Sequence, residues 1–154
     1  MAIHYLHSQR ATVILAATLP VPILTIPILL IAPNKPWWLI ALLILLTIVG
    51  AVLFSSLTVS VDDTTLTWWF GIGLVRKSVP LADIVAAQPI RTSFLEGWGI
   101  HRTRYGWLYN VSGFDAVWIQ RRSGKTFALG TNDVDGLHRA LLAALPKSDA
   151  LQNP

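Results

Sequence analysis

Hydrophobic residues are distributed in two different ways along this chain. Near the N-terminus they fill two long runs, residues 11–31 and 37–57, and after residue 56 they alternate with polar residues. Each run matches the roughly 20 residues that a helix needs to cross a bilayer. The link between them, residues 32–36, leaves room only for a tight turn. The pattern therefore predicts an antiparallel hairpin of two transmembrane helices with both chain ends on one side.

The two apolar runs differ in proline content. The first contains Pro20, Pro22 and Pro27, each of which removes a backbone hydrogen bond, so we expect a kinked span. A re-entrant segment and a cleaved signal peptide are the alternatives for this run. The second run has no proline and predicts a straight helix. Trp37 and Trp38 stand at its start, where aromatic rings favour the headgroup layer.

Alternation with a period of two predicts β-strands in the second half of the chain. Seven strands are expected, at residues 57–61, 65–70, 74–79, 85–90, 107–112, 116–122 and 125–130. A glycine-rich connection at residues 91–106 separates the fourth strand from the fifth. A helix is expected from Asn132 or Asp133 as N-cap to Leu145, with Pro146 ending it, because apolar residues recur there at helical spacing.

Two glycine motifs resemble phosphate-binding loops. Gly71-Ile72-Gly73 lacks the third glycine of a dinucleotide fingerprint, since position 76 is arginine, and a strand follows instead of a helix. The Gly-Lys-Thr that begins at Gly124 lacks the glycine that a P-loop requires five residues earlier. We interpret the first motif as a bend between strands and Ser123-Gly124 as a hairpin turn.

Charge is scarce in the first part of the chain and ordinary in the second. Only 13% of the residues are charged, about half the usual share. The net charge of +4 comes half from Arg10 and Lys35, which flank the first run, so it does not indicate a nucleic-acid binder. Cysteine is absent, which excludes disulfides, a thiolate nucleophile and a cysteine metal site.

Seven short strands and one amphipathic helix can bury a core in fewer than a hundred residues if the sheet curls into a barrel that the helix caps. The segments "FGIGLVRKSVPLADI" and "YGWLYNVSGFDAVWIQRRSGKTFALGTND" and the helix after them resemble the bacterial pleckstrin-homology-like (PH-like) family, in which membrane helices precede the domain. The expected organisation is an N-terminal tail (1–10), a transmembrane hairpin (11–57, spans 11–31 and 37–57), a PH-like domain (58–146) and a C-terminal tail (147–154).

The resemblance implies no catalytic residues and no common ligand. Lipid-binding PH domains hold a phosphorylated headgroup with basic residues in the first hairpin. The corresponding hairpin here carries Asp62 and Asp63, which repel phosphate, so headgroup binding there is not expected.

Six residues are candidates for contact with a partner or with lipid: Trp68, Trp69, Arg102, Arg104, Arg121 and Arg122. Neighbours in a strand point to opposite faces, so one tryptophan of the pair is expected in the core and the other at a surface. Trp98, Trp107 and Trp118 are open to the same two interpretations. The four arginines form either a solvated rim or a surface for anionic headgroups.

The sequence offers little support for catalysis or metal binding. His4 and His7 lack a third ligand, and capping explains Asn132, Asp133 and Asp135 better than calcium does. His101 and Ser123 have no identifiable catalytic partners, and the glycosylation sequon at Asn110 falls within an expected strand. We therefore predict no enzymatic activity, no cofactor and no metal.

These observations favour a non-enzymatic module of a membrane complex. We expect an integral membrane protein, in a bacterial inner membrane with both termini cytoplasmic, that acts through protein contact as an accessory, assembly or scaffolding subunit. Its partners are then the lipid bilayer and another protein or a second copy of the chain, and not nucleic acid. The alternative is a module that senses an anionic lipid or a small ligand through the basic loop around Arg102 and Arg104.

Overall fold

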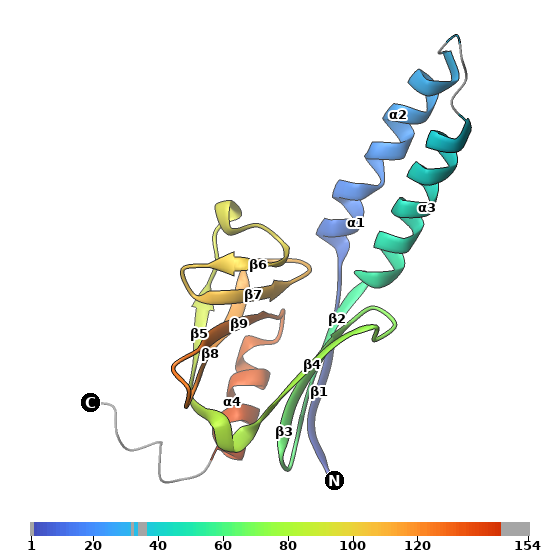
Figure 1. Ribbon diagram of the computed structural model, residues 1–154. Helices are drawn as coiled ribbons and strands as arrows, with labels where there is room; N and C mark the ends of the chain where they lie inside the picture. Colours follow the sequence, from blue (N-terminus) through green and yellow to red (C-terminus); the bar gives the residue numbers. More distant parts are fainter. Residues whose placement is uncertain (1, 32, 34–36, 146–154) are drawn as a thin grey trace.

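The computed structural model describes residues 2–31, 33 and 37–145, and it combines an apolar helical rod with a β-rich domain (Figure 1). The helical rod consists of α1 (Thr12–Thr18), α2 (Pro20–Ile31) and α3 (Trp37–Leu53). α1 and α2 follow one another, and α3 lies beside both of them (Figure 1). The predicted link at residues 32–36 lies mostly outside the described residues, as do Pro146 and the predicted tail at 147–154.

The interruption that the prolines predict is found at Leu19. α1 ends one residue before Leu19, and α2 begins at Pro20. A proline has no amide hydrogen to donate but is well suited to the first turn of a helix, so it ends one hydrogen-bond ladder and begins the next. Pro27 lies inside α2.

The prediction of two transmembrane helices is wrong. In the part of the chain that the structure describes, one helical stretch, Thr12–Ile31 (α1 and α2 together, 20 residues), is long and apolar enough to cross a membrane by length and composition. α3 has 17 residues and ends at Leu53, short of the predicted residue 57. The end of the apolar run belongs to a strand, because the β-branched residues Thr58, Val59 and Val61 favour an extended backbone over a helix.

The first sheet has four antiparallel strands in the order β1-β2-β3-β4. Its strands are β1 (Ile3–Arg10), β2 (Ser56–Asp62), β3 (Thr65–Phe70) and β4 (Val75–Pro80). β1 replaces the predicted N-terminal tail. The inward positions of β1 carry Tyr5, His7 and Gln9 in place of aliphatic residues, so its hydrophobic alternation is weak. The strand is held in the sheet by its antiparallel pairing with β2.

The second sheet has five strands in the order β5-β8-β9-β7-β6, of which β7 and β9 are parallel. Its strands are β5 (Ile84–Arg91), β6 (Gly99–Thr103), β7 (Gly106–Asn110), β8 (Asp115–Arg121) and β9 (Thr126–Gly130). Short 3-10 turns precede and follow β5, η1 (Leu81–Asp83) and η2 (Phe94–Glu96). β6 lies in the segment that the sequence analysis treated as a connection.

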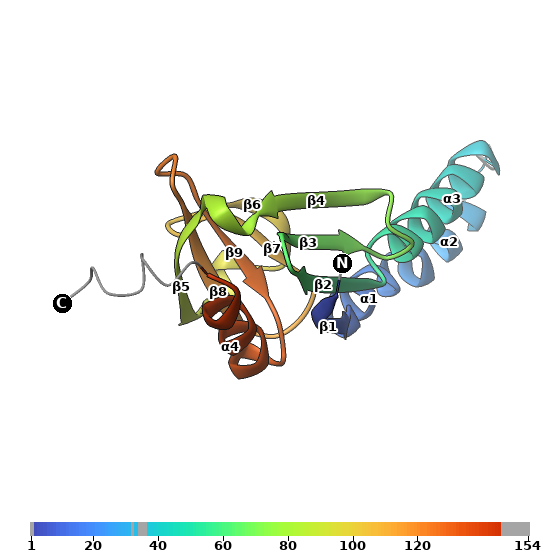
Figure 2. The same cartoon turned by 90° about the horizontal axis from the view of Figure 1, so that it is seen from below.

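The predicted barrel of about seven strands is therefore also wrong: two separate sheets of four and five strands face each other without closing. β4 passes into β5 through η1, and the chain changes sheets at this point. The single C-terminal helix α4 (Val134–Ala144) is present as expected and packs on β1, β2, β5 and β8 (Figure 2). Asp133 caps it by accepting a 3.1 Å hydrogen bond from the amide of Gly136.

The bend at Gly71 has a steric cause. Gly71 has a φ of 47°, and a Cβ built on it would lie 2.2 Å from the carbonyl oxygen of Val52 at the end of α3. Only glycine fits where the β3–β4 turn meets the helical rod. This turn is a bend between strands, as predicted, and so is the turn at Ser123 and Gly124, where the Gly124 amide bonds to the Arg121 carbonyl at 2.9 Å.

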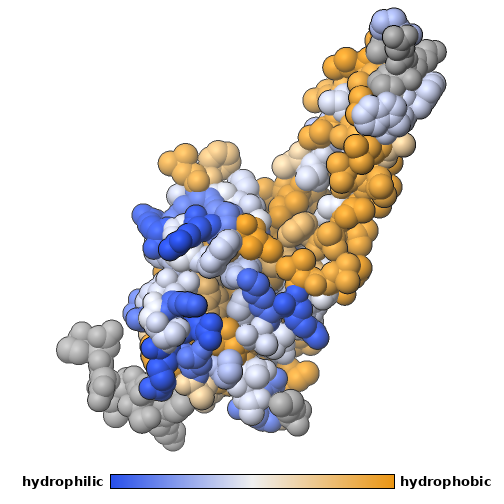
Figure 3. All heavy atoms as spheres, viewed as in Figure 1, coloured by the Kyte–Doolittle hydropathy of each residue, from blue (hydrophilic) through white to orange (hydrophobic). Residues whose placement is uncertain are grey.

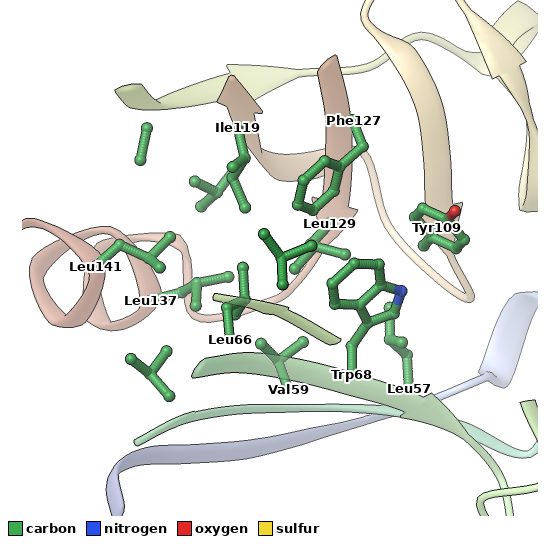
Figure 4. Close-up of a cluster of buried hydrophobic side chains, with 14 of the residues drawn as sticks. Leu57, Val59, Leu66, Trp68, Tyr109, Ile119, Phe127, Leu129, Leu137 and Leu141 are labelled. Carbon is green, nitrogen blue, oxygen red and sulfur yellow. The ribbon is translucent and has the colours of Figure 1, made fainter. Parts of the chain in front are cut away.

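The hydrophobic core lies between the two sheets and α4. Figure 4 shows Leu137 and Leu141 of α4 on one side of the core, and Trp68, Tyr109 and Phe127 on the other. Full burial of one such aliphatic or aromatic side chain contributes roughly 1.5–3 kcal/mol to the free energy of unfolding. α4 thus closes one side of the space between the sheets, whereas aromatic residues line the opposite side.

Candidate functional site

The two adjacent tryptophans of β3 lie on opposite faces, as the alternation predicted. Trp68 is buried in the core, with 3% of its surface exposed, and its ring stacks on Phe127 at a centroid distance of 5.0 Å. Trp69 is half-buried on the outer face of the first sheet. The guanidinium of Arg76 covers its ring at 4.6 Å from the centroid.

The four predicted arginines lie at two hairpins. Because β7 and β9 are parallel, the β6–β7 hairpin and the β8–β9 hairpin lie at the same end of the second sheet. Arg104 is bound to Glu96, with 3.1 Å between Nε and the carboxylate. Arg121 forms an ion pair with Asp83. Arg102 is exposed on the edge strand β6.

Arg122 is tied to the same turn as Arg121. Its backbone amide donates a 2.7 Å hydrogen bond to the carbonyl of Asp83, and its side chain is exposed. Arg121 at the end of β8 and Arg122 directly after it therefore both fasten the β8–β9 hairpin to η1. Of the four predicted arginines, at least Arg104 and Arg121 form ion pairs with carboxylates of the same chain.

A pocket of about 300 Å³ lies between the two sheets, on the side opposite α4. It is lined by residues of β3, β4, β7, β8 and β9 and the hairpin between the last two: Trp68, Lys77, Ser78, Val79, Trp107, Tyr109, Arg121, Lys125 and Phe127. Pockets for small molecules usually combine apolar and aromatic walls with a few polar groups, and this composition fits that description. We call it the inter-sheet pocket.

Lys77 is the central polar group of the inter-sheet pocket. It pairs with Trp68 across β3 and β4, so it points to the inner face of the first sheet. Its ammonium donates a 2.9 Å hydrogen bond to the hydroxyl of Tyr109 on the other sheet. The same ammonium lies 5.9 Å from the centre of the Trp107 ring.

Lys77, Tyr109, Lys125 and Phe127 are not among the site residues that the sequence predicts. The strand "LVRKSV" carried a usable signal, because Lys77 occupies the same face as the apolar residues Val75 and Val79. A lysine on an inward face is unusual, and this one lies on the edge strand β4 with its side chain exposed to solvent. The long-range register that brings Lys77 to Tyr109 is not encoded in that local pattern.

The three other tryptophans of the β-rich domain are half-buried or exposed. Trp98 is half-buried and donates a 2.9 Å hydrogen bond from its indole nitrogen to the carbonyl of Gly113. Trp118 is half-buried within β8. Trp107 is 49% exposed at the rim of the inter-sheet pocket.

Hydrogen bonds account for the residues that resembled metal or catalytic sites. His4 lies 2.6 Å from Asp63, and His7 lies 2.6 Å from the side chain of Asn132. His101 contacts the carbonyl of Glu96. Asn110 is fully buried, so its sequon is closed to modification in the folded protein. Within the described residues, no group of three or more histidine and acidic side chains is arranged to hold a metal ion.

The acidic hairpin between β2 and β3 binds its own backbone. Amide hydrogen bonds from Thr64, followed by hydroxyl and amide bonds from Thr65, lower the pKa of Asp62 to about 2. The pKa of Asp63 is also lowered, first by the amide of Ala2 and then by His4. Both carboxylates are therefore ionised at neutral pH and already accept hydrogen bonds from neighbouring groups.

No protein-family model, curated protein or solved structure matches this chain. The relationship to the PH-like family therefore stays a prediction from the quoted sequence segments.

Proposed function

We propose that this chain is a non-enzymatic, membrane-anchored module that acts through protein contact as an accessory, assembly or scaffolding subunit of a membrane complex. The observation that carries the proposal is the helical rod. The window of Thr12–Ile31 that matches a membrane span has none of its residues buried. Figure 3 shows the rod hydrophobic over most of its visible surface, whereas the β-rich domain carries the strongly hydrophilic residues together with smaller hydrophobic patches. Such a surface is stable in lipid and not in water.

Two apolar loops support a location of the β-rich domain at the bilayer surface. Phe94 and Leu95 of η2 are 72% and 95% exposed, and Ile72 and Leu74 of the β3–β4 turn are 68% and 74% exposed. Both loops lie toward the end of the domain from which the helical rod projects (Figure 1). A bilayer that surrounds the rod would cover these side chains as well.

β1 and β2 supply the connection between rod and domain. They precede and follow the rod in the chain and pair with each other from Arg10 with Ser56 onward. Both ends of the apolar segment therefore lie on the side of the β-rich domain. Arg10 and the N-terminal amine belong to this end of the apolar segment and Lys35 to the other, and by the positive-inside rule this difference favours a cytoplasmic location of both termini, which we place in a bacterial inner membrane.

The outer face of the first sheet is the surface that we assign to a protein partner or to a second copy of the chain. Trp69 and Arg76 stack there, and tryptophan and arginine are the residues most enriched in interface hot spots. Serine and threonine side chains surround them. One of these is Thr67, which lies two residues before Trp69 in β3 and therefore on the same face.

The anchoring part of the proposal is tested by extraction of membranes with alkaline carbonate. We expect the full-length protein to stay in the pellet, and release into the supernatant would contradict anchoring. Replacement of Phe94 and Leu95 by serine should leave the protein in the pellet but speed proteolysis of the β5–β6 loop in vesicles.

The contact part is tested by cross-linking and purification in mild detergent. A stoichiometric partner or a homo-oligomer is expected, and the interaction should weaken roughly tenfold or more in Trp69→Ala. Thr67→Ala on the same face is the matched control. A monomer by light scattering with no copurifying protein would count decisively against a scaffold.

A second candidate function is the sensing of an anionic lipid through the loop around Arg102 and Arg104. The exposed side chain of Arg102 favours this second function. The 3.1 Å ion pair of Arg104 with Glu96 reduces the positive charge that the loop can offer to a lipid headgroup. Salt-sensitive binding to anionic vesicles that Arg102→Glu abolishes would support it. Equal binding by the variant and the parent protein would eliminate it.

A further inference from the structure

The inter-sheet pocket has the features of a ligand site that the proposed membrane module does not use. We propose that it binds a small organic anion, in which Lys77 and Lys125 hold an oxyanion group and the aromatic walls contact a flat apolar part. This inference goes beyond protein contact and requires no partner protein.

The charge in the inter-sheet pocket is unbalanced. Three cationic side chains line it, Lys77, Arg121 and Lys125, and no acidic side chain is among its lining residues in the described part of the chain. Arg121 is neutralised by Asp83, with Nε at 2.7 Å from the carboxylate. Lys77 of β4 and Lys125 of the β8–β9 hairpin remain; both side chains are exposed and line the same pocket, and an anionic group bound there would pair with this positive charge.

Within the described residues, the ammonium of Lys77 contacts uncharged groups: the hydroxyl and ring of Tyr109 and the ring of Trp107. A lysine in this position accepts an anion without first breaking an ion pair. A lysine that points inward on an edge strand also prevents that edge from pairing with the edge strand of another molecule. If this were the only role of Lys77, no ligand would be expected.

A buried donor lies beside the same cations. The indole nitrogen of Trp68 is buried and has no hydrogen-bond partner among the described residues, although the side chain lines the pocket. In Figure 4 this nitrogen lies on the side of the indole that faces Tyr109, which is the residue that binds Lys77. An unpaired buried N–H is uncommon, and it marks a place where an acceptor improves the energy.

The walls of the pocket are aromatic. Trp107 is 49% exposed at the rim, while Tyr109 and Phe127 are 4% and 6% exposed further in. A flat ring can stack on Trp107 while its anionic substituent reaches the ammonium of Lys77. The volume of about 300 Å³ is at the lower end of the range for small-molecule pockets, so it fits an aromatic acid or a small phosphate ester.

The test uses the full chain in nanodiscs of zwitterionic lipid, with indole nitrogen-15 NMR as the readout. Phenyl phosphate and benzoate are the charged probes, and benzyl alcohol is the neutral one. We expect the charged probes to shift the indole signals of Trp68 and Trp107 in a saturable, salt-sensitive manner. Benzyl alcohol should bind roughly tenfold more weakly or not at all. No shift with either charged probe at millimolar concentration would overturn the proposal.

Variants separate a ligand role from a structural role. Lys77→Met and Lys125→Met keep the aliphatic stem and should each weaken binding roughly tenfold, whereas Lys77→Arg should retain it. Arg91→Met removes an exposed charge of the second sheet outside the pocket and should bind like the parent. Parent-like binding by Lys77→Met would overturn the assignment, and unchanged backbone spectra confirm that each variant is folded.

The same NMR experiment distinguishes the two sources of such an anion. Nanodiscs that contain phosphatidic acid should shift the same two indole signals if a lipid headgroup enters the pocket. Soluble probes alone shift them if the ligand is a free metabolite. The carbonate extraction and the copurification experiments that test the proposed function do not depend on these NMR results. A failure of the ligand proposal therefore does not contradict the proposed function.

Discussion

Arg121 at the end of β8 directs both Nε and Nη2 to a single carboxylate oxygen of Asp83 in η1, the former at 2.7 Å. The ion pair joins the second sheet to the turn where the chain leaves the first. It is partly shielded, since 33% and 26% of the two side chains are exposed. The guanidinium of Arg121 is therefore paired within the molecule.

The first prediction concerns the strength of this ion pair. A double-mutant cycle with Arg121→Ala and Asp83→Ala should give a coupling of about 1 kcal/mol in the free energy of unfolding, because partial exposure limits the gain. The measurement is denaturant unfolding of the full chain in detergent. The coupling should shrink in high salt, and purely additive effects would show that the two residues do not act together.

The second prediction concerns acid stability. The folded pKa of Asp62 is about 2 against an ordinary value of 3.8, so the ionised form stabilises the fold above that ordinary value. This stabilisation is lost as the pH falls from 3.8 toward 2. Asp62→Asn should therefore lower the melting temperature at neutral pH, and the difference from the parent should vanish at low pH.

Asp115→Asn is the matched control for Asp62, because its carboxylate is exposed and lies 3.9 Å from Arg91. It should change the acid limb of the stability curve much less. Identical curves for the two variants would show that the turn hydrogen bonds to Asp62 do not cause the effect.

The sequence predicted the parts of the fold that depend on local pattern. The seven expected strands, the turn at Asp62, the bends at Gly71 and Gly124 and the Asp133 cap all depend on alternation, glycine or short polar side chains, which act within a few residues. The sequence did not predict β1 or β6, because their inward or edge positions carry polar residues. The sequence also predicted a helix up to Leu57, whereas residues 54 and 55 form a turn and β2 begins at Ser56.

The candidate site was the least predictable part. Lys77 and Tyr109 are separated by 32 residues, and they meet only because the two sheets face each other. Arg121 appeared available in the sequence because Asp83 lies 38 positions away. Long-range register, which no local pattern encodes, decides which charges are paired and which line a pocket.

The third prediction concerns the cap of α4. Asp133 accepts from the Gly136 amide at 3.1 Å and from the Tyr5 hydroxyl at 3.2 Å, so it fixes both α4 and β1. Asp133→Ala should lower the free energy of unfolding by about 1–2 kcal/mol. Tyr5→Phe should cost less, because the cap remains. Asp135→Ala, in the first turn but outside the cap, is the control, and an equal loss there would contradict the capping role.

The last prediction tests β1 directly, because a disordered tail and a sheet strand respond differently to charge. Gln9 is buried and donates a 2.6 Å hydrogen bond to the carbonyl of Ser112, whereas Leu6 is 58% exposed on the opposite face of β1. Gln9→Lys places an unpaired charge in the interior and should lower the free energy of unfolding by roughly 3 kcal/mol or more. Leu6→Lys should change it by less than about 0.5 kcal/mol. Chemical denaturation followed by circular dichroism measures both, and equal, negligible effects would mean that residues 3–10 do not pair with β2 in solution.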